Sequence, residues 1–164
     1  MPESPYRICF VCLGNICRSP TAAVVMRQLV TGAGLGGSVE VDSAGTGGWH
    51  VGQGANPDAL RAMTRVGYDG RDHVAQQFGI DDFARYDLVV GLDGANVRDL
   101  QRIAPDEVAR AKVVLIRDHD PDAPPGSDVP DPWGGPDAGF DDVLVQVQAA
   151  CAGLLERLRP VLTR

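Results

Sequence analysis

Short apolar segments alternate with longer amphipathic segments along this chain, and the alternation limits the folds that it can adopt. Strands are expected at Tyr6–Val11, Ser38–Ser43, Asp87–Gly91 and Lys112–Ile116, with helical spacing of apolar residues between or after them. Such alternation is typical of a parallel sheet with helices on both faces and right-handed connections. The sequence therefore predicts an α/β three-layer sandwich.

Turn and capping residues mark where the predicted helices begin and end. The apolar residues that follow Pro20 keep helical spacing, and Asn56-Pro57 is a typical N-cap and first-turn pair for a helix that stops at Gly67. These elements fit a single domain over residues 1–164, with a four-stranded parallel sheet in the flavodoxin-like order 2-1-3-4. Further helices are expected over three segments: Asp81–Tyr86, Asn96–Ala104 and Phe140–Leu158.

The segment between Arg117 and Phe140 fits neither helix nor strand. It is rich in proline, and the chain has no Lys or Arg from Asp118 through Glu156. Loops of this length in compact domains are usually functional or disordered, and the proline residues favour a loop of defined shape. We therefore expect this acidic loop to take part in function.

Composition argues against several classes of partner. The net charge of −7 argues against nucleic acid. No apolar run approaches the length of a membrane span, and no charged segment followed by an apolar one opens the chain. We expect a cytoplasmic monomer without membrane contact, with export by another route left open. No metal is expected, because neither group of possible ligands has the spacing of a metal site: Cys9, Cys12, Cys17 and Cys151, or His50, His73 and His119.

The stretch CLGNICRSP, from Cys12 to Pro20, joins the first predicted strand to the first predicted helix. Ligands of open parallel sheets bind beyond the carboxyl ends of the strands, which is where Cys12 lies. Gly14 and Asn15 can adopt left-handed conformations, and Ser19 before Pro20 suits an N-cap and first helical position. Inward N–H groups and the positive end of the helix dipole favour an anion. We therefore expect a phosphate-binding loop.

The reactive side chains of this loop indicate phosphoryl transfer. A helix N-terminus and a neighbouring cation favour the thiolate form of a cysteine, so Cys12 is expected to act as a nucleophile. Arg18 stays protonated, and its planar guanidinium can bind two phosphate oxygens. Ser19 can donate a hydrogen bond to the sulfur and help it leave. Such a site needs no metal. A bare C-x5-R pattern would be weak evidence, but its place between a strand and a helix makes it specific.

This stretch resembles the phosphate-binding loop of the low-molecular-weight protein tyrosine phosphatases. The similarity continues, in the order of the family, through VDSAGTGGWHVG, RDHVAQQ, DLVVGLDGAN and DVPDPWGG. The resemblance implies hydrolysis of phosphotyrosine proteins and small aryl phosphates through a phosphocysteine intermediate, without a cofactor. It also implies phosphate as product and competitive inhibitor. The loop residues that it assigns to phosphate or substrate binding are Leu13, Gly14, Asn15, Ile16, Cys17 and Ser19.

The leaving oxygen of a phosphate ester needs a general acid from another segment. The acidic loop offers several aspartates, and chemistry alone does not choose among them. The family places its general acid in an Asp-Pro-aromatic stretch, which Asp131-Pro132-Trp133 matches, and Pro130 helps to fix the backbone. We expect Asp131 to protonate the leaving group and then to activate water. The other candidates are Asp118, Asp120, Asp122, Asp128 and Asp137.

Two tryptophans and a polar set complete the expected site. Trp49 lies among glycines that cannot form a core around it, and the resemblance makes it a cleft wall opposite Trp133. Two aromatic walls would hold a phenyl ring and leave phosphoserine too short to reach the thiolate. By resemblance, Ser43 and His73 hold Asn15 in a left-handed conformation through hydrogen bonds. Two histidines match no role in the family and are expected to be structural: His50 and His119.

The cysteines suggest a redox hypothesis. Cys17 lies in the same tight loop as Cys12, so peroxide is expected to give a disulfide that protects the nucleophile. Cys9 and Cys151 are expected to be buried. The chain departs from the family at Trp133 and Gly134, where many members carry two tyrosines that can be phosphorylated, so regulation through that pair is lost and one side of the cleft opens.

Three other functions stand as alternatives. Arsenate reductases of this fold pass oxidation to further cysteines on a mobile segment, whereas here Cys151 stands alone. Protein arginine phosphatases carry a threonine where this chain has Ile16, which matches the phosphotyrosine type. A phosphate-binding module without activity would be expected to have lost Cys12 or Asp131, and the chain has both.

Overall fold

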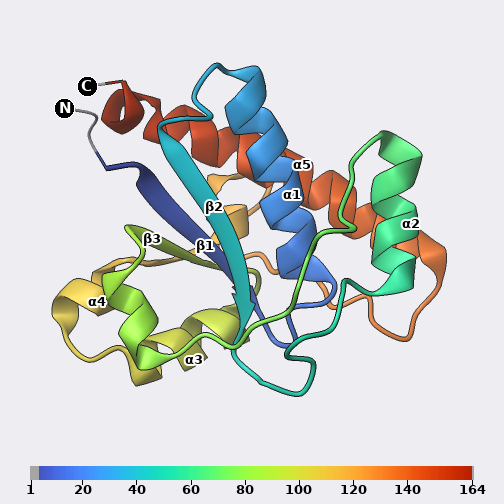
Figure 1. The fold of residues 1–164 in the computed structure, drawn as a ribbon, viewed down its shortest axis with the longest axis horizontal. Helices are drawn as coiled ribbons and strands as arrows, with labels where there is room; N and C mark the ends of the chain where they lie inside the picture. Colours follow the sequence, from blue (N-terminus) through green and yellow to red (C-terminus); the bar gives the residue numbers. More distant parts are fainter. Residues whose placement is uncertain (1–3, 164) are drawn as a thin grey trace.

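The computed structural model describes residues 4–163 and contains one four-stranded sheet. All neighbouring strands pair in parallel, in the order β2-β1-β3-β4, so the predicted flavodoxin-like order is confirmed (Figure 1). The register pairs Ile8 with Val41 and Phe10 with Val90. The strands are β1 (Tyr6–Cys12), β2 (Val39–Gly45), β3 (Leu88–Gly91) and β4 (Val113–Leu115).

Helices cover both faces of this sheet, as the alternation of segments predicts. Asn56 caps α2 by accepting a hydrogen bond from the Asp58 amide at 2.8 Å, and Gly67 ends that helix with a left-handed φ of 95°. The α-helices are α1 (Arg18–Gly32), α2 (Pro57–Val66), α3 (Gly94–Ile103), α4 (Glu107–Ala111) and α5 (Asp137–Leu162), and two short 3-10 helices are η1 (Ile80–Ala84) and η2 (Ile116–His119).

The core lies on both faces of β1, because successive side chains of a strand point to opposite faces. Ile8 and Phe10 join the apolar residues of α1 and α5 on one face. Cys9 and Val11 join those of η1, α3 and α4 on the other face. A third cluster packs α2 against the loop that follows β1 and the start of α5. The carboxyl end of β1 is therefore held firmly from several sides.

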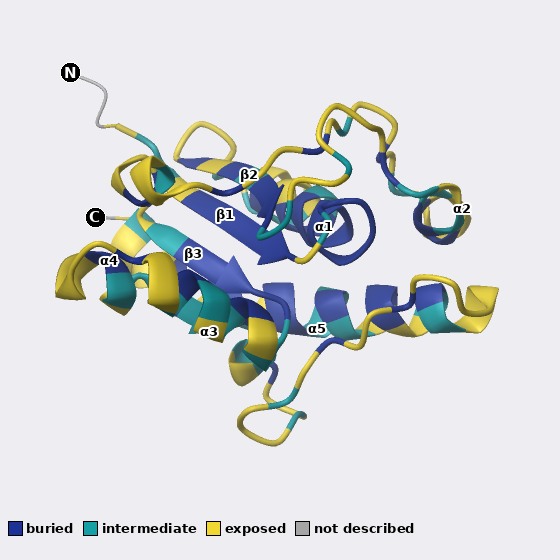
Figure 2. Ribbon diagram, turned by 90° about the horizontal axis from the view of Figure 1, so that it is seen from below, coloured by how far each residue is buried: buried dark blue, intermediate teal, exposed yellow. Residues whose placement is uncertain are grey.

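The long helix α5 has the length and hydropathy of a membrane-spanning segment, yet its apolar residues belong to the core. Its buried face packs against α1 and the sheet, and its other face is open to solvent (Figure 2). Val147 and Leu154 are fully or almost fully buried there. Packing within the protein therefore accounts for the apolar character of α5.

Several boundaries differ from those expected. The helix α1 begins at Arg18 with Cys17 as its N-cap, so the assignment of Ser19 as N-cap was wrong. The short helix α4 was not predicted; it begins after Pro105, where Asp106 caps it by accepting a hydrogen bond from the Ala109 amide at 2.8 Å. A loop was expected between Arg117 and Phe140. In the structure η2 extends to His119 and α5 begins at Asp137, so the loop is shorter at both ends.

Candidate active site

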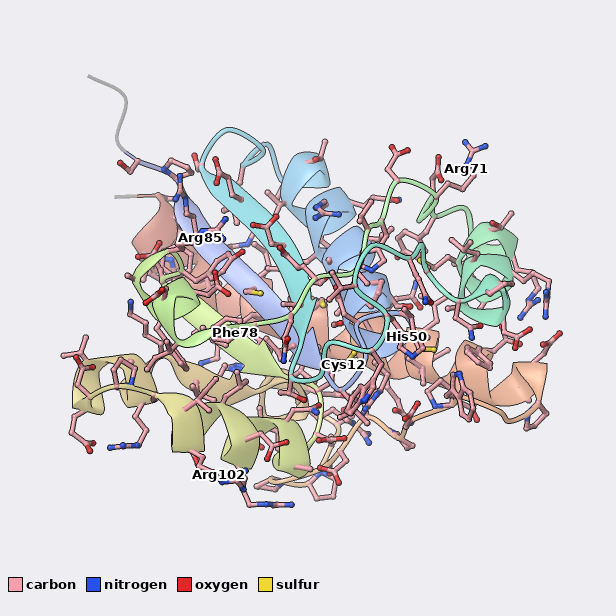
Figure 3. All side chains as sticks on the ribbon, turned by 60° about the horizontal axis from the view of Figure 1, so that its bottom comes forward. Cys12, His50, Arg71, Phe78, Arg85 and Arg102 are labelled. Carbon is pink, nitrogen blue, oxygen red and sulfur yellow. The ribbon has the colours of Figure 1, made fainter. Side chains whose placement is uncertain are left out.

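The loop after β1 folds around the sulfur of Cys12. Cys12 lies at the carboxyl end of β1 (Figure 3), and its side chain is buried. Its Sγ accepts a hydrogen bond from the Asn15 amide at 3.3 Å and lies 2.9 Å from the Ser19 hydroxyl. A thiolate is stabilised by such donors and by the start of α1 behind it. The loop therefore places the sulfur of the predicted nucleophile at its centre.

Asn15 holds the shape of this loop. It is the single non-glycine residue with a positive φ, 58°, within residues 4–163. Its side-chain Nδ2 donates to the Ser19 and Ser43 hydroxyls at 2.8 and 2.9 Å, and its side-chain Oδ1 accepts from the Gln76 backbone N–H at 2.9 Å. His73 Nε2 donates to the Asn15 carbonyl at 2.6 Å. The structure thus brings Ser43 and His73 to the place where the sequence predicted them.

Two expected roles change in detail. Ser19 lies inside α1, and its hydroxyl accepts from Asn15 Nδ2 at 2.8 Å. Its own hydrogen can go to the Cys12 sulfur at 2.9 Å or to the Ala44 carbonyl at 3.3 Å, and a thiolate at Cys12 is the nearer acceptor. A capping role would have turned this hydroxyl away from the sulfur. Gly14 does not have a positive φ; its missing side chain instead gives room to His50, whose Cδ2 would lie 3.1 Å from a Cβ at that position.

Arg18 is held rigidly above the loop. Its side chain is 4% exposed, and its Nη1 donates to Asp93 Oδ2 at 2.5 Å and to the Val129 carbonyl at 3.0 Å. Burial alone would lower the pKa of Arg18, but the hydrogen bond to Asp93 and nearby negative charges outweigh it and raise the pKa. The guanidinium is therefore a fixed cation, and its Nη2 side faces Asp131, with Oδ2 at 4.0 Å.

Asp131 is the candidate acid that the structure brings to the nucleophile. It lines the same cavity as Cys12 and Arg18, and its side chain is 48% exposed. The other aspartates of the acidic loop do not line this cavity. Asp120 and Asp128 accept hydrogen bonds from loop or helix amides, and Asp137 faces Arg61. Among these aspartates the geometry therefore favours Asp131, and its role as general acid stays a prediction.

The cavity above the loop is open to solvent and walled by two indole rings. Its volume is about 240 Å³, and Trp49 and Trp133 are 70% and 64% exposed at its rim. Gly47 lets the Trp49 ring lie against the backbone in this orientation, because a Cβ at that position would lie 1.8 Å from the ring. Leu13, Gly14, Ile16, Cys17 and His50 complete the lining. A flat aromatic group fits between such walls.

Sequence reasoning missed several contributors. Asp93 stands in a family segment to which the sequence assigned no role, although it lies two residues after the end of β3 and so at the same sheet edge as Cys12. Asp93 could have been predicted from the sequence, because ligands of parallel sheets bind beyond the carboxyl ends of the strands. His50 was expected to be structural only, yet it lines the cavity, and Nδ1 lies 3.0 Å from Gln53 Oε1 (Figure 3). Nothing in the sequence indicated the backbone contacts from Gln76 and Val129.

Two further groups near the loop have shifted pKa values. Burial lowers the pKa of His73, so the ring is neutral near pH 7 and its Nε2–H can donate to Asn15. Burial raises the pKa of Cys17 to about 12, so it is a thiol. No cluster of three or more possible metal ligands occurs among residues 4–163, and the expected independence of metal stays a prediction.

Comparison with known proteins agrees with this geometry. The family model described as low molecular weight phosphotyrosine protein phosphatase matches residues 7–162. The chain belongs to this family. A low molecular weight protein-tyrosine-phosphatase of Streptomyces coelicolor is 53% identical over 155 residues, which cover 94% of each chain. Low molecular weight protein-tyrosine phosphatase A of Mycobacterium tuberculosis is 40% identical, covering 93% of this chain and 91% of that protein.

A solved structure shows the same architecture. The crystal structure of a protein tyrosine phosphatase from Entamoeba histolytica, with Hepes in its active site, superposes with a TM-score of 0.90 at 31% sequence identity. The match covers 95% of this chain and 98% of the other. The family resemblance and the flavodoxin-like fold inferred from the sequence are therefore confirmed, and the chain is an enzyme of the phosphotyrosine phosphatase family.

Proposed function

We propose that the phosphotyrosine hydrolysis of this family runs on Cys12, Arg18 and Asp131 in two steps. In the first, the Cys12 thiolate attacks phosphorus, and the bond from phosphorus to the tyrosine oxygen breaks. Asp131, in its protonated form, gives its proton to the departing oxygen. Arg18 and the loop amides bind the equatorial oxygens of the phosphoryl group as it passes to sulfur.

The second step returns the enzyme to its starting state. Asp131, now a carboxylate, takes a proton from a water molecule, and the resulting hydroxide attacks phosphorus. The bond between sulfur and phosphorus breaks, the thiolate re-forms, and phosphate leaves. The Ser19 hydroxyl, held by Asn15 and 2.9 Å from Sγ, donates its hydrogen to the departing sulfur anion and stabilises it.

One observation carries this proposal. A single cavity is lined by a buried sulfur and a buried guanidinium from the loop after β1 and by a half-exposed carboxylate from a distant segment of the chain. The acid lies at the mouth and the nucleophile at the floor, which is the order that a phosphate ester needs for displacement in line. Phosphate, as product, would occupy the same loop and inhibit competitively.

The walls favour an aryl phosphate protein substrate. The indoles of Trp49 and Trp133 can hold a phenyl ring, and a serine phosphate lacks the length to reach Sγ past them. Ile16 lines the cavity where an arginine phosphatase would carry threonine, and this favours phosphotyrosine over phosphoarginine. We propose that the chain acts as a single domain and as a monomer in the cytoplasm, on phosphotyrosine proteins and without nucleic acid.

Hydrolysis of small aryl phosphates, measured with a chelator present, tests the roles of Cys12 and Asp131. Cys12→Ser is expected to have no turnover. Asp131→Asn is expected to lower kcat by about 10²–10⁴, more for phenyl phosphate than for p-nitrophenyl phosphate, since a poorer leaving group depends more on a general acid.

Asp122→Asn is the matched control, because Asp122 is an exposed aspartate of the same acidic region and does not line the cavity. It should keep the wild-type kcat. Asp131→Asn with wild-type activity on both esters would move the acid to another residue. Faster hydrolysis of phosphoarginine than of phosphotyrosine would favour the arginine phosphatase.

A further inference from the structure

A second hollow lies directly behind the wall of the active-site cavity. It has a volume of about 270 Å³ and lies between residues 130–136, here called the acid loop, and the first turns of α5. Asp131 and Trp133 line both this hollow and the active-site cavity. A peptide that places its phosphotyrosine against Trp133 therefore passes the edge of the hollow within a few residues.

The floor of the hollow carries an unpaired negative charge. Three aspartates lie in the first turns of α5. Asp137 and Asp141 pair with arginines of α2, Arg61 at 3.6 Å and Arg65 at 2.6 Å. Asp142 lines the hollow, is exposed, and forms no ion pair with any group of residues 4–163. The protein thus pairs Asp137 and Asp141 with arginines of α2 and Asp131 with Arg18, and among these carboxylates it leaves Asp142 without an ion pair.

The chain has no cationic residue near Asp142 in sequence that could pair with it. From residue 118 to residue 156 it has neither Lys nor Arg, although this stretch forms the acid loop and most of α5. A cation that neutralises Asp142 therefore has to come from another part of the chain, which the described ion pairs do not provide, or from a bound molecule. Charge complementarity favours a basic group of the substrate.

Two other lining residues suit a guanidinium in particular. Gln146 also lines the hollow, and its Oε1 is buried without a hydrogen-bond partner, so it lacks a donor. Trp133 offers an exposed indole ring, on which a cation stacks favourably. Arginine has several donors in a planar fork and stacks well, whereas lysine is a compact point charge. Carboxylate, amide oxygen and indole together are complementary to arginine.

We propose that this hollow binds an arginine side chain that lies close to phosphotyrosine in the substrate protein. The proposal rests on the phosphotyrosine activity argued above and adds a sequence preference to it. The phosphoryl group binds in the loop around Cys12, the phenyl ring lies between the two indoles, and the arginine passes behind Trp133 to reach Asp142. Small aryl phosphates do not extend to the hollow and are insensitive to it.

Phosphotyrosine peptides that differ in one residue test this preference. Arginine is placed in turn at each of the three positions before and after phosphotyrosine, and each peptide is compared with one that carries citrulline there. Citrulline keeps the shape of arginine and lacks the charge. We expect at least one position at which arginine raises kcat/KM by about 5- to 20-fold, the range of a partly exposed charged hydrogen bond.

Two enzyme variants separate the hollow from the general field of an acidic protein. Asp142→Asn should remove the preference for arginine and keep the wild-type kcat/KM for p-nitrophenyl phosphate. Asp141→Asn makes the same charge change one residue away, at a carboxylate paired with Arg65, and should keep the preference. Equal loss in both variants would assign the effect to long-range charge and overturn the proposal.

The outcome also distinguishes this proposal from the activity on which it rests. Equal kcat/KM for arginine and citrulline peptides at every position, with p-nitrophenyl phosphate still hydrolysed, would overturn the arginine site alone. Failure of the wild-type enzyme to hydrolyse p-nitrophenyl phosphate would instead overturn the proposed function. A preference for arginine that persists in Asp142→Asn would place the basic side chain elsewhere.

Discussion

Asn15 shows at the scale of one residue how backbone and side chain cooperate in the phosphate-binding loop. Its φ of 58° points its amide at the Cys12 sulfur, and four hydrogen bonds to its side chain and carbonyl hold that conformation. Asparagine is one of the few residues that adopt this conformation without glycine's flexibility. The residue therefore supplies both the turn and the support of the site.

Replacing Asn15 by alanine and by glycine separates these two contributions. Asn15→Ala is expected to lower the free energy of unfolding by about 1–3 kcal/mol for the unpaired buried partners and by about 1–2 kcal/mol more for the left-handed backbone. Asn15→Gly should recover the second part, because glycine has no Cβ penalty. Urea unfolding measures both. Equal stability of the two variants would show that the left-handed backbone is not strained in the alanine variant.

Cys12 and Cys17 line one cavity, and Cys12 is the predicted nucleophile, which gives the redox hypothesis a definite order of events. Peroxide is expected to oxidise the Cys12 thiolate first, to a sulfenic acid. The thiol of Cys17, whose pKa burial raises to about 12, then displaces water and forms the disulfide. Mass spectrometry after peroxide treatment should show this bond in the wild type.

The matched comparison is between Cys17→Ser and Cys151→Ser under the same treatment. Cys17→Ser should accumulate sulfinic and sulfonic acid at Cys12 and lose activity that thiols cannot restore. Cys151 is fully buried in the α5 packing, so Cys151→Ser should behave as the wild type. Over-oxidation of Cys12 in the wild type, with Cys17 left as a thiol, would refute the protective disulfide.

The sequence was sufficient to identify the residues with local signals and insufficient for those that depend on packing. Cys12, Arg18 and Asp131 stand in short motifs with a chemical reason for each residue type. Asp93 follows the end of β3, so its place at the sheet edge was predictable, whereas its hydrogen bond to Arg18 was not. His50 reaches the site on a separate loop and carries no local signature. Arg18 illustrates the limit, because its charge was predictable and its orientation by Asp93 and the Val129 carbonyl was not.

Elements with strong periodicity or caps were predicted well, and short ones were not. The four strands appear where the apolar runs predicted them, and α2 begins at Asn56-Pro57 and ends at Gly67 as expected. The five-residue helix α4 is too short for periodicity to show. The start of α1 was misplaced because Ser19 resembles a cap, whereas the fold uses its hydroxyl at the Cys12 sulfur.

The contact between η2 and α5 contains a partly buried histidine, His119. Gly153 in α5 lets the His119 carbonyl approach so closely that a Cβ would lie 1.8 Å from it. Both ring nitrogens of His119 are buried without hydrogen-bond partners. Burial, and next the charge of Arg157, lower the pKa of His119 from its ordinary 6.5. The folded protein therefore binds a proton at His119 only at a lower pH than the unfolded chain does.

This contact predicts an acid-sensitive stability. As pH falls below about 6.5, the unfolded chain binds a proton at His119 before the folded protein does, so the free energy of unfolding decreases. His119→Leu should show a shallower decrease between pH 8 and pH 5.5 in urea unfolding. Some slope should remain, because burial also lowers the pKa of His73. A difference in the free energy of unfolding between His119→Leu and the wild type at pH 8 reflects the change in packing, because the histidine is neutral there in both states. Identical slopes in variant and wild type would contradict the prediction.

At the scale of the whole molecule, an acidic protein has to attract an anion. The chain carries a net charge of −7, and the phosphate-binding loop opposes it with the amides of one turn, the start of α1 and the buried Arg18. All of these lie at the carboxyl edge of the sheet and directly follow β1, a strand that is packed on both faces. Anion binding at this edge is therefore coupled to the folding of the entire core.

Phosphate should consequently stabilise the whole fold. A ligand at one hundred times its dissociation constant adds about 2.7 kcal/mol to the free energy of unfolding, and for a chain of this size each kcal/mol raises Tm by about 2–4 °C. We expect a rise of about 5–10 °C in phosphate over chloride of equal ionic strength. Arg18→Lys should lose most of this rise, because an ammonium group cannot bind two phosphate oxygens in the bidentate manner of a guanidinium. Arg102→Lys, on the exposed face of α3, should keep it. An equal rise in both variants would mean that phosphate binds elsewhere.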